Sequence, residues 1–205
     1  MTMLYRLDAA AAVIAARFGA LAGDDPWAGG TIAPGKFAPV VTAGREAVAG
    51  PRAPGAPRRL TPRLWGVPSP PSAHDPARLV PSVRNAQSPF WIGNLRNSEF
   101  RCLIPASAFM EWGRVDPVTN KRRQHWFACS DQPLFAFAGV WKDSEVPGFA
   151  LLTCEANAAL RQAGCSAMPV ILPDDPEARR LWLHGDWKRA EALLQPYPSS
   201  LLVAG

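Results

Sequence analysis

The sequence predicts an α+β protein whose core is a curved, mainly antiparallel sheet. Strand-like segments follow one another through the middle of the chain, whereas the helix-like segments lie towards its two ends. Helices and strands do not alternate as they would in βαβ units, which argues against a doubly wound parallel sheet. Polar turns at 113–124 and 142–147 separate neighbouring strand-like segments and therefore favour hairpins.

Length and composition favour one folded domain with long loops. The chain has 205 residues, of which 48% are apolar and 19% charged, and this is enough to bury a hydrophobic core. Its 16 glycines and 22 prolines indicate a loop-rich protein and stay below the content typical of a disordered chain. We expect a single domain over residues 1–205, with flexible proline-rich loops at 47–59 and 68–81.

Apolar residues at helical spacing predict a first helix over about 8–21, with Asp8 as its N-cap and Gly23 at its end. Further helices are expected at 86–95, at 155–163 and, as two short helices separated near Gly185, at 174–194.

Runs of apolar, β-branched and aromatic residues predict the strands of the sheet. They are expected at 40–42, 60–67, 100–104, 108–112, 125–129, 134–141, 149–153, 168–172 and 201–203. The stretch between Asp24 and Pro39 is punctuated by Gly and Pro, and we expect a loop there.

The sequence gives no sign of a membrane span, a secretory signal or a metal site. No run approaches 18 consecutive apolar residues, and the first residues lack the pattern of a signal peptide. The four cysteines and three histidines are spread out, without the paired spacing of zinc ligands. We therefore expect a cytoplasmic protein with reduced thiols, no metal and no cofactor, and take a monomer as the default state.

Positive charge is concentrated in the middle of the chain. Residues 52–123 carry 12 basic and 4 acidic side chains, whereas residues 124–205 carry 6 basic and 9 acidic ones. Arginine supplies 18 of the 22 basic residues, and its planar guanidinium suits phosphate well. Tryptophans are interleaved with this charge, a pattern that fits nucleic-acid binding. The alternative is an arginine-rich composition with tryptophans in the core.

Two side chains stand out as candidates for chemistry. Glu111 lies between large apolar neighbours on an expected strand; if it is buried, its raised pKa makes it a general acid or base, and the alternative is a strand-edge residue facing water. Asn85 follows a proline-rich stretch and is either a helix cap or a fixed amide that orients a substrate. No phosphate-binding loop and no Ser/His/Asp arrangement is visible.

A set of segments in the middle and the second half of the chain carries a resemblance to a known family. They are 64–68 (LWGVP), 101–106 (RCLIPA), 109–112 (FMEW), 135–141 (FAFAGVW), 152–157 (LTCEAN) and 168–172 (MPVIL). Their order and relative positions resemble those of the SRAP family, the SOS response-associated peptidases that shield abasic sites in single-stranded DNA. The resemblance extends from the first residues to about Val203.

The resemblance implies a SRAP-like fold, with a curved sheet or barrel core and short flanking helices. It also implies a covalent chemistry in which an N-terminal cysteine condenses with the aldehyde of an abasic site and closes a thiazolidine. Asn85 and Glu111 match the assisting asparagine and glutamate of the family. The positions that match the surroundings of its DNA groove are Arg84, Arg101, Trp112 and Thr153.

The chain departs from the family pattern at two decisive places. Position 2 is Thr2 instead of cysteine, and residues 164–167 (GCSA) hold no histidine before Met168. Removal of Met1 would leave the Thr2 amine, whose pKa of about 7.7–8.0 keeps a useful fraction neutral at pH 7. We therefore expect the Thr2 amine, assisted by Asn85 and Glu111, to form a reversible imine with the aldehyde, because a hydroxyl closes a less durable ring than a thiol.

Three functions remain open from the sequence. The first is binding of abasic single-stranded DNA with weakened crosslinking chemistry, which the retained Asn85 and Glu111 favour. The second is an inactive relative that serves as a DNA-binding or regulatory module, which the loss of the thiol and the histidine favours. The third is a hydrolase or peptidase that uses Glu111 with Thr2 in another way. Cys165, close to the position of the missing histidine, is either a partial substitute or inert packing.

Overall fold

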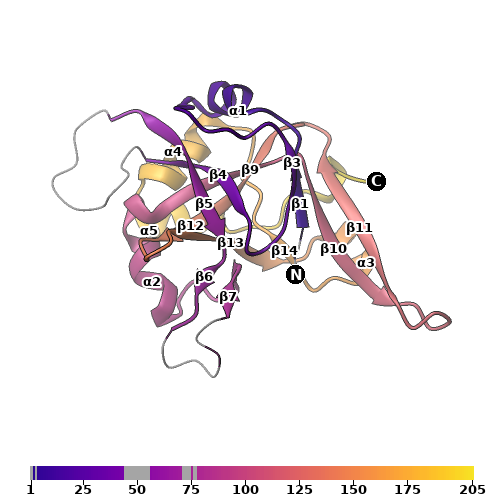
Figure 1. Cartoon of the computed structure of the whole chain (residues 1–205). Coiled ribbons are helices and arrows are strands. Elements are labelled where there is room, and N and C mark those ends of the chain that lie inside the picture. Colours follow the sequence, from indigo (N-terminus) through magenta and orange to yellow (C-terminus); the bar gives the residue numbers. More distant parts are fainter. Residues whose placement is uncertain (1, 3, 44–55, 71–74, 76–77) are drawn as a thin grey trace.

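A closed ring of strands forms the centre of the protein (Figure 1). The computed structural model describes residues 2, 4–43, 56–70, 75 and 78–205. It contains mostly antiparallel strands and short helices, which confirms the expected α+β class. The larger sheet contains, in spatial order, β14 (Ala167–Pro169), β13 (Gly148–Glu155), β12 (Phe135–Lys142), β9 (Arg101–Ala106), β4 (Phe37–Thr42), β5 (Arg58–Trp65) and β2 (Ala20–Leu21).

One parallel pairing closes this sheet into a barrel. Strand β13 pairs with β5 through Gly148 opposite Leu64 and Phe149 opposite Trp65, while β5, β4, β9, β12 and β13 are otherwise joined by antiparallel ladders. The two backbones approach closely at Gly148, where a Cβ atom would lie 2.4 Å from the carbonyl oxygen of Gly66. The ring of Trp65 stacks on that of Phe149 just inside the closure. Glycine is therefore required where the barrel closes.

The second sheet brings the start of the chain beside the middle of the sequence. Its spatial order is β15 (Leu202–Ala204), β11 (Arg122–Cys129), β10 (Ala108–Val115), β1 (Leu4–Leu7) and β3 (Gly30–Ile32). Strand β1 lies antiparallel to β10, with Leu4 opposite Met110 and Tyr5 opposite Phe109. Strand β1 was not expected from the sequence, and a loop was expected where β3 lies, because both strands are short and β3 begins with glycine.

An aromatic cluster holds β1 against the barrel. The fully buried ring of Tyr5 lies edge-on to Trp65, with 5.0 Å between ring centroids, and edge-on to Phe137 at 6.0 Å. Phe109 on β10 lies 5.8 Å from the same Phe137 ring. Each such pair contributes about 0.5–1.5 kcal/mol beyond the area it buries. The cluster therefore fixes where the chain enters the second sheet, and so where residue 2 lies.

Short helices flank the sheets. They are α1 (Ala11–Phe18), α2 (Pro89–Arg96), α3 (Ala158–Ala163), α4 (Pro176–His184) and α5 (Trp187–Ala190), with 3₁₀ turns η1 (Ser98–Phe100), η2 (Glu191–Leu193) and η3 (Ser199–Leu201). Helix α1 is shorter than expected: the Asp8 carboxylate accepts a hydrogen bond from the hydroxyl of Ser107 instead of capping it, and Gly19, at φ 59°, ends it. No helix of the described residues has the length and apolar character needed to cross a membrane.

The proline-rich stretches contain more strand than expected. Residues 47–55 of the first expected loop lie outside the described residues, but Arg58 and Arg59 belong to β5. The second stretch, 68–81, was expected to be a loop, yet it supplies most of a small hairpin in which β6 (Val67–Pro68) pairs with β7 (Leu79–Val80). The expected strand at 60–67 is also broken, because Gly66 takes a φ of 121° between β5 and β6.

Candidate functional site

Residue 2 lies on a buried carboxyl group. The Thr2 hydroxyl donates a short hydrogen bond to Oε1 of Glu111, and each of these residues is only 1% exposed. The contact follows from the sheet, since β1 runs antiparallel to β10 and carries the chain start towards the position of Glu111. The structure thus brings together two of the residues proposed for catalysis from the sequence.

Burial decides the chemistry of Glu111. The sequence left open whether this side chain faces water, and the structure places it inside, between Met110 and the half-buried Trp112 on β10. Burial raises the pKa of the Glu111 carboxyl above its ordinary value, and the hydrogen bond from Thr2 offsets only part of that rise. A carboxyl group with a raised pKa can hold a proton at a pH at which an exposed glutamate has lost it.

A cavity of about 560 Å³ opens beside this pair. Its wall includes Glu111 from β10, Thr153 and Cys154 from β13, and Ser166 and Met168 from the loop and strand that follow α3. This volume falls within the range of small-molecule sites, about 300–1,000 Å³. A group that enters the cavity would therefore contact the Glu111 carboxyl, to which Thr2 is hydrogen-bonded.

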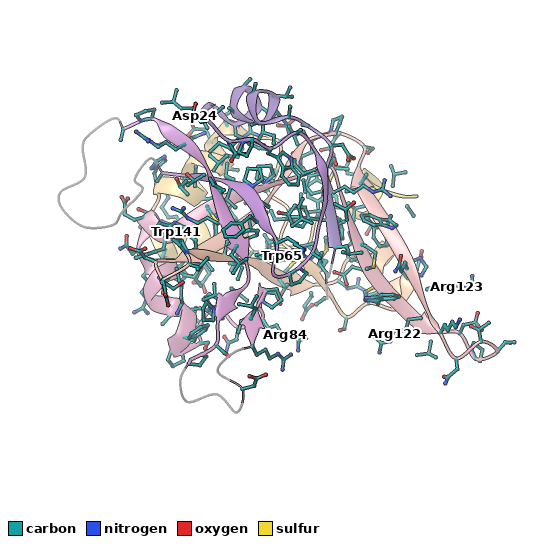
Figure 2. All side chains as sticks on the ribbon, viewed as in Figure 1. Asp24, Trp65, Arg84, Arg122, Arg123 and Trp141 are labelled. Atoms are coloured by element: carbon teal, nitrogen blue, oxygen red, sulfur yellow. The ribbon has the colours of Figure 1, made fainter. Side chains whose placement is uncertain are left out.

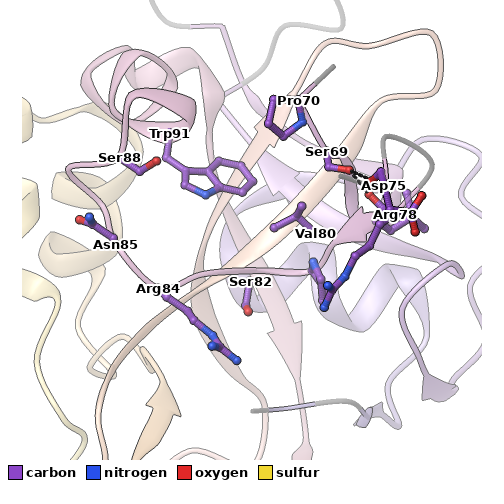
Figure 3. A pocket seen from close by; sticks show the side chains of 12 residues that line it. Ser69, Pro70, Asp75, Arg78, Val80, Ser82, Arg84, Asn85, Ser88 and Trp91 are labelled. Carbon is purple, nitrogen blue, oxygen red and sulfur yellow. Dashed lines mark hydrogen bonds between the residues drawn. The ribbon is translucent and has the colours of Figure 1, made fainter. Parts of the chain in front are cut away.

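Arg84 joins this cavity to a second one. The second cavity measures about 690 Å³ and is bordered by Ser82, Asn85, Ser88 and Trp91, and Arg84 lines both. Figure 3 shows the Arg84 side chain extending from the strand end that also carries Ser82. The exposed guanidinium therefore lies at the border of the two cavities, where an anionic chain crossing from one to the other would pass.

Thr153 has a positioning contact. Strand β8 (Ser82–Val83) pairs with β13 through Ser82 opposite Leu151 and Val83 opposite Leu152. The Thr153 hydroxyl then donates to the carbonyl oxygen of Val83 at 2.9 Å. It thereby fixes the backbone immediately before Arg84. Both residues, which the resemblance assigns to the surroundings of a DNA groove, line the 560 Å³ cavity.

Asn85 does not join the Thr2–Glu111 pair. Its exposed side chain accepts a hydrogen bond from the backbone N–H of Gln87 at 3.0 Å and points away from Trp91 in Figure 3. This is a local turn ahead of α2, whose N-cap is Ser88. Of the two alternatives for Asn85, the helix cap is therefore excluded for α2, and Asn85 borders the second cavity instead of the cavity lined by Glu111.

Arg101 is not placed to contact DNA. Its side chain is fully buried, donates to the carbonyl oxygen of Gly185 and lies 5.7 Å from the ring centroid of Trp182. Burial lowers the pKa of its guanidinium to about 10. The expectation that Arg101 lies at a DNA groove is corrected accordingly, because its guanidinium is directed to Gly185 and Trp182 inside the protein.

Two further side chains lie near the pair: Cys165, whose role the sequence left open, and His125, which was not assigned to the site from the sequence. Cys165 is 8% exposed, and its Sγ lies 3.6 Å from the backbone oxygen of Trp112. His125 stands directly opposite Glu111 in the β10–β11 ladder. The expected hairpin at 108–129 could have revealed His125, but the return of Cys165 to β10 depends on tertiary structure. In the described residues, no group of three His, Cys, Asp or Glu side chains could hold a metal ion.

Comparison with solved structures shows the fold. A protein from Bordetella bronchiseptica superposes with a TM-score of 0.76 over 99% of this chain and 98% of its own, at 20% identity. A protein from Bacteroides thetaiotaomicron gives a TM-score of 0.75 over 98% and 90%, at 18% identity. At these identities the likeness concerns the arrangement of elements alone.

Sequence comparison identifies the family. The chain is 38% identical over 112 residues to the abasic site processing protein YoqW of Bacillus subtilis and 36% identical to YobE of the same species. Each match covers 51% of this chain, and it spans about half the length of those curated relatives, 48% and 49%. The family described as SOS response associated peptidase (SRAP) matches residues 1–204. The chain therefore belongs to the SRAP family.

Proposed function

We propose that the protein binds single-stranded DNA at abasic sites and engages the sugar aldehyde through the amine of Thr2. The relatives named abasic site processing proteins support this substrate. The observation that carries the proposal is the contact of Thr2 with Glu111, a buried carboxyl group with a raised pKa at the wall of a 560 Å³ cavity. We expect the sugar of an abasic site, which carries no base, to enter this cavity, whereas a nucleotide in a base pair is held within the duplex.

The chemistry is the formation of an imine. Once Met1 is removed, the Thr2 nitrogen attacks the aldehyde carbon and gives a carbinolamine. Loss of its hydroxyl as water leaves a C=N bond between Thr2 and the sugar. The departing hydroxyl needs a proton, and we assign its donation to Glu111, because burial raises the pKa of this carboxyl and so favours its protonated form. The nitrogen gives up its own proton, and addition of water reverses the sequence.

Charge and shape support binding of a single strand. Arg84 and Thr153 line the cavity, and the half-buried Trp112 directly follows Glu111 on β10. Figure 2 shows Arg122 and Arg123 on the β10–β11 hairpin, away from Arg84. An unpaired backbone can follow such arginines while its abasic sugar enters the cavity.

An inactive DNA-binding or regulatory module is the second candidate. It is favoured by Thr2, whose hydroxyl cannot close a ring as durable as that of a thiol, and by residues 164–167, which hold no histidine. The two candidates differ in one outcome, because only the first forms a covalent bond with abasic DNA.

Borohydride trapping tests the proposal. Protein with Met1 removed is incubated with a single strand carrying one abasic site, with sodium borohydride present. We expect an adduct of protein plus DNA that is absent with an intact strand and absent when the N-terminal amine is acetylated. Salt-dependent binding without any trapped adduct would refute the imine and establish the second candidate.

A further inference from the structure

A thiol that the imine chemistry does not use lies beside the Thr2–Glu111 pair. The Sγ of Cys165 lies 3.6 Å from the backbone oxygen of Trp112, the residue after Glu111. The backbone on both sides of this thiol is fixed, since Cys165 N–H donates to Leu160 at 2.9 Å and Ser166 accepts from Ala156 at 3.2 Å. The position of Cys165 is therefore set by the turn between α3 and β14 and by its contact with β10.

Cys165 and Thr2 share Glu111 as a neighbour. The Thr2 hydroxyl is bonded to the Glu111 carboxyl, and the same carboxyl acts electrostatically on the Cys165 thiol. Burial raises the pKa of this thiol, and Glu111 raises it further whenever its carboxyl is ionised. The thiol therefore stays protonated at neutral pH, and any reaction at its sulfur needs a nearby acceptor for that proton.

We propose that Cys165 captures the imine formed at Thr2 by adding its sulfur to the former aldehyde carbon. The inference rests on the proposed function, because the imine is its substrate. The S–H bond breaks and an S–C bond forms, while the C=N double bond becomes a C–N single bond. The proton released from sulfur ends on the imine nitrogen, and Glu111, which interacts with both Thr2 and Cys165, carries it. Nothing leaves, and no oxidant or reductant is needed.

The product is an N,S-acetal whose nitrogen and sulfur come from residues 163 positions apart in the sequence. It resembles the thiazolidine of an N-terminal cysteine in its bonds to carbon, but its ring is closed by the fold. Thiol addition makes the linkage slower to hydrolyse than the imine, because the C–S bond must break and regenerate the imine before water can add. We therefore expect a protein–DNA adduct that survives without borohydride.

The other cysteines are less suited to this role. Cys102 and Cys129 are buried on β9 and β11, and burial raises the pKa of Cys129 to about 12. Cys154 lines the same 560 Å³ cavity, but the carboxylate that acts on its thiol is Glu155 and not Glu111. Cys154 is consequently the matched control, because its carboxylate neighbour is Glu155 and not the Glu111 that Thr2 contacts.

The experiment compares wild type, Cys165→Ser and Cys154→Ser on single-stranded abasic DNA, each with and without borohydride. The adduct formed without borohydride should be lost in Cys165→Ser and kept in Cys154→Ser. Borohydride-trapped adduct should remain in all three proteins, and peptide mapping of the untreated wild-type adduct should place the sugar on both Thr2 and Cys165. Trapping by borohydride also shows that Cys165→Ser retains its fold and its site.

The outcomes separate this inference from the proposed function. If borohydride traps adduct in every protein, the imine is supported. The role of Cys165 would then be overturned by either of two results: no untreated adduct in wild type, or equal amounts of it in wild type and Cys165→Ser. Loss of the untreated adduct in Cys154→Ser alone would assign the thiol to Cys154 and also overturn it. Absence of trapped adduct from wild type would refute the proposed function itself.

Discussion

At the scale of single residues, the site depends on how far burial changes ordinary side chains. Glu111 was recognisable in the sequence because a carboxylate between Met110 and Trp112 on a strand is unusual, yet only the fold shows that it is buried. Arg101 was misjudged for the same reason. An arginine next to a cysteine in a strand looks alike in sequence whether it faces solvent or the ring of Trp182.

Glu111→Gln should slow imine formation strongly. The amide keeps the shape and an oxygen that accepts from the Thr2 hydroxyl, but it cannot donate a proton to the departing hydroxyl. General acid catalysis contributes about 10²–10⁴-fold, so a loss of at least the lower value is expected. The rate of borohydride trapping at saturating protein measures it. An unchanged rate would exclude Glu111 as the acid.

The same substitution should alter the pH dependence of stability. The pKa of Glu111 is raised in the folded protein, so the folded state holds the proton more tightly than the unfolded state. As the pH rises from the ordinary glutamate pKa to the raised one, wild type should therefore lose stability relative to Glu111→Gln, by about 1.4 kcal/mol for each pH unit between the two values. Thermal unfolding of both proteins between pH 4 and pH 8 checks this; parallel curves would contradict it.

Thr2→Cys should restore the ring closure that threonine cannot provide durably. In the Cys165→Ser background, the new thiol stands on the same residue as the attacking amine and can close a five-membered thiazolidine. We expect adduct without borohydride to appear in the double variant and to be absent from Cys165→Ser alone. Gel analysis after removal of free DNA measures it. No gain would mean that the cavity cannot hold the sugar near residue 2.

At the scale of elements, apolar runs predicted the long strands, and polar turns predicted where those strands end. Strands β9 to β13 were recognisable because their apolar residues are dense and their turns are polar. Strand β1 was not, since four residues carry little pattern and it is held mainly by Tyr5 inside the aromatic cluster. The placement of Arg84 likewise depends on a strand of two residues, β8, and on the hydroxyl of Thr153.

Arg84→Gln should weaken DNA binding in a salt-dependent manner. Each phosphate contact on a single strand contributes about 0.7 to the slope of log K against log salt, so the slope should fall by about that amount. Arg180→Gln is the control, because Arg180 is exposed on α4 and paired with Glu177 at 2.6 Å. Fluorescence anisotropy over a salt series measures both. An equal slope in Arg84→Gln and wild type would remove Arg84 from the binding surface.

At the scale of the whole molecule, the resemblance implied a curved sheet or barrel, but the residue pattern alone could not predict which strands close it. The class of the fold follows from the order of strands and helices, but the parallel contact of β13 with β5 joins residues far apart in the chain. The residue that this contact requires is Gly148, and the sequence alone does not show that the backbone of Gly66 approaches it. The same closure positions β13, and with it the wall of the candidate site.

Gly148→Ala should destabilise the protein as a whole. The added methyl group would lie 2.4 Å from the carbonyl oxygen of Gly66, and the backbone must move apart to admit it. Overpacking of this kind costs about 1–3 kcal/mol. Gly93→Ala is the control, since nothing lies within 4 Å of its Cβ position on α2, and replacing a helical glycine stabilises by up to about 1 kcal/mol. Urea unfolding compares them, and equal midpoints would contradict the closure.

The proposed function requires that the amine of Thr2, held at a buried carboxyl, bonds to the aldehyde of an abasic sugar. Mass spectrometric mapping of the borohydride-reduced adduct is the decisive experiment, because reduction converts the imine into a stable amine and so keeps the sugar on the nitrogen that formed it. We expect the sugar on the α-nitrogen of Thr2. A sugar found on a lysine side chain, with Thr2 unmodified, would refute this mechanism.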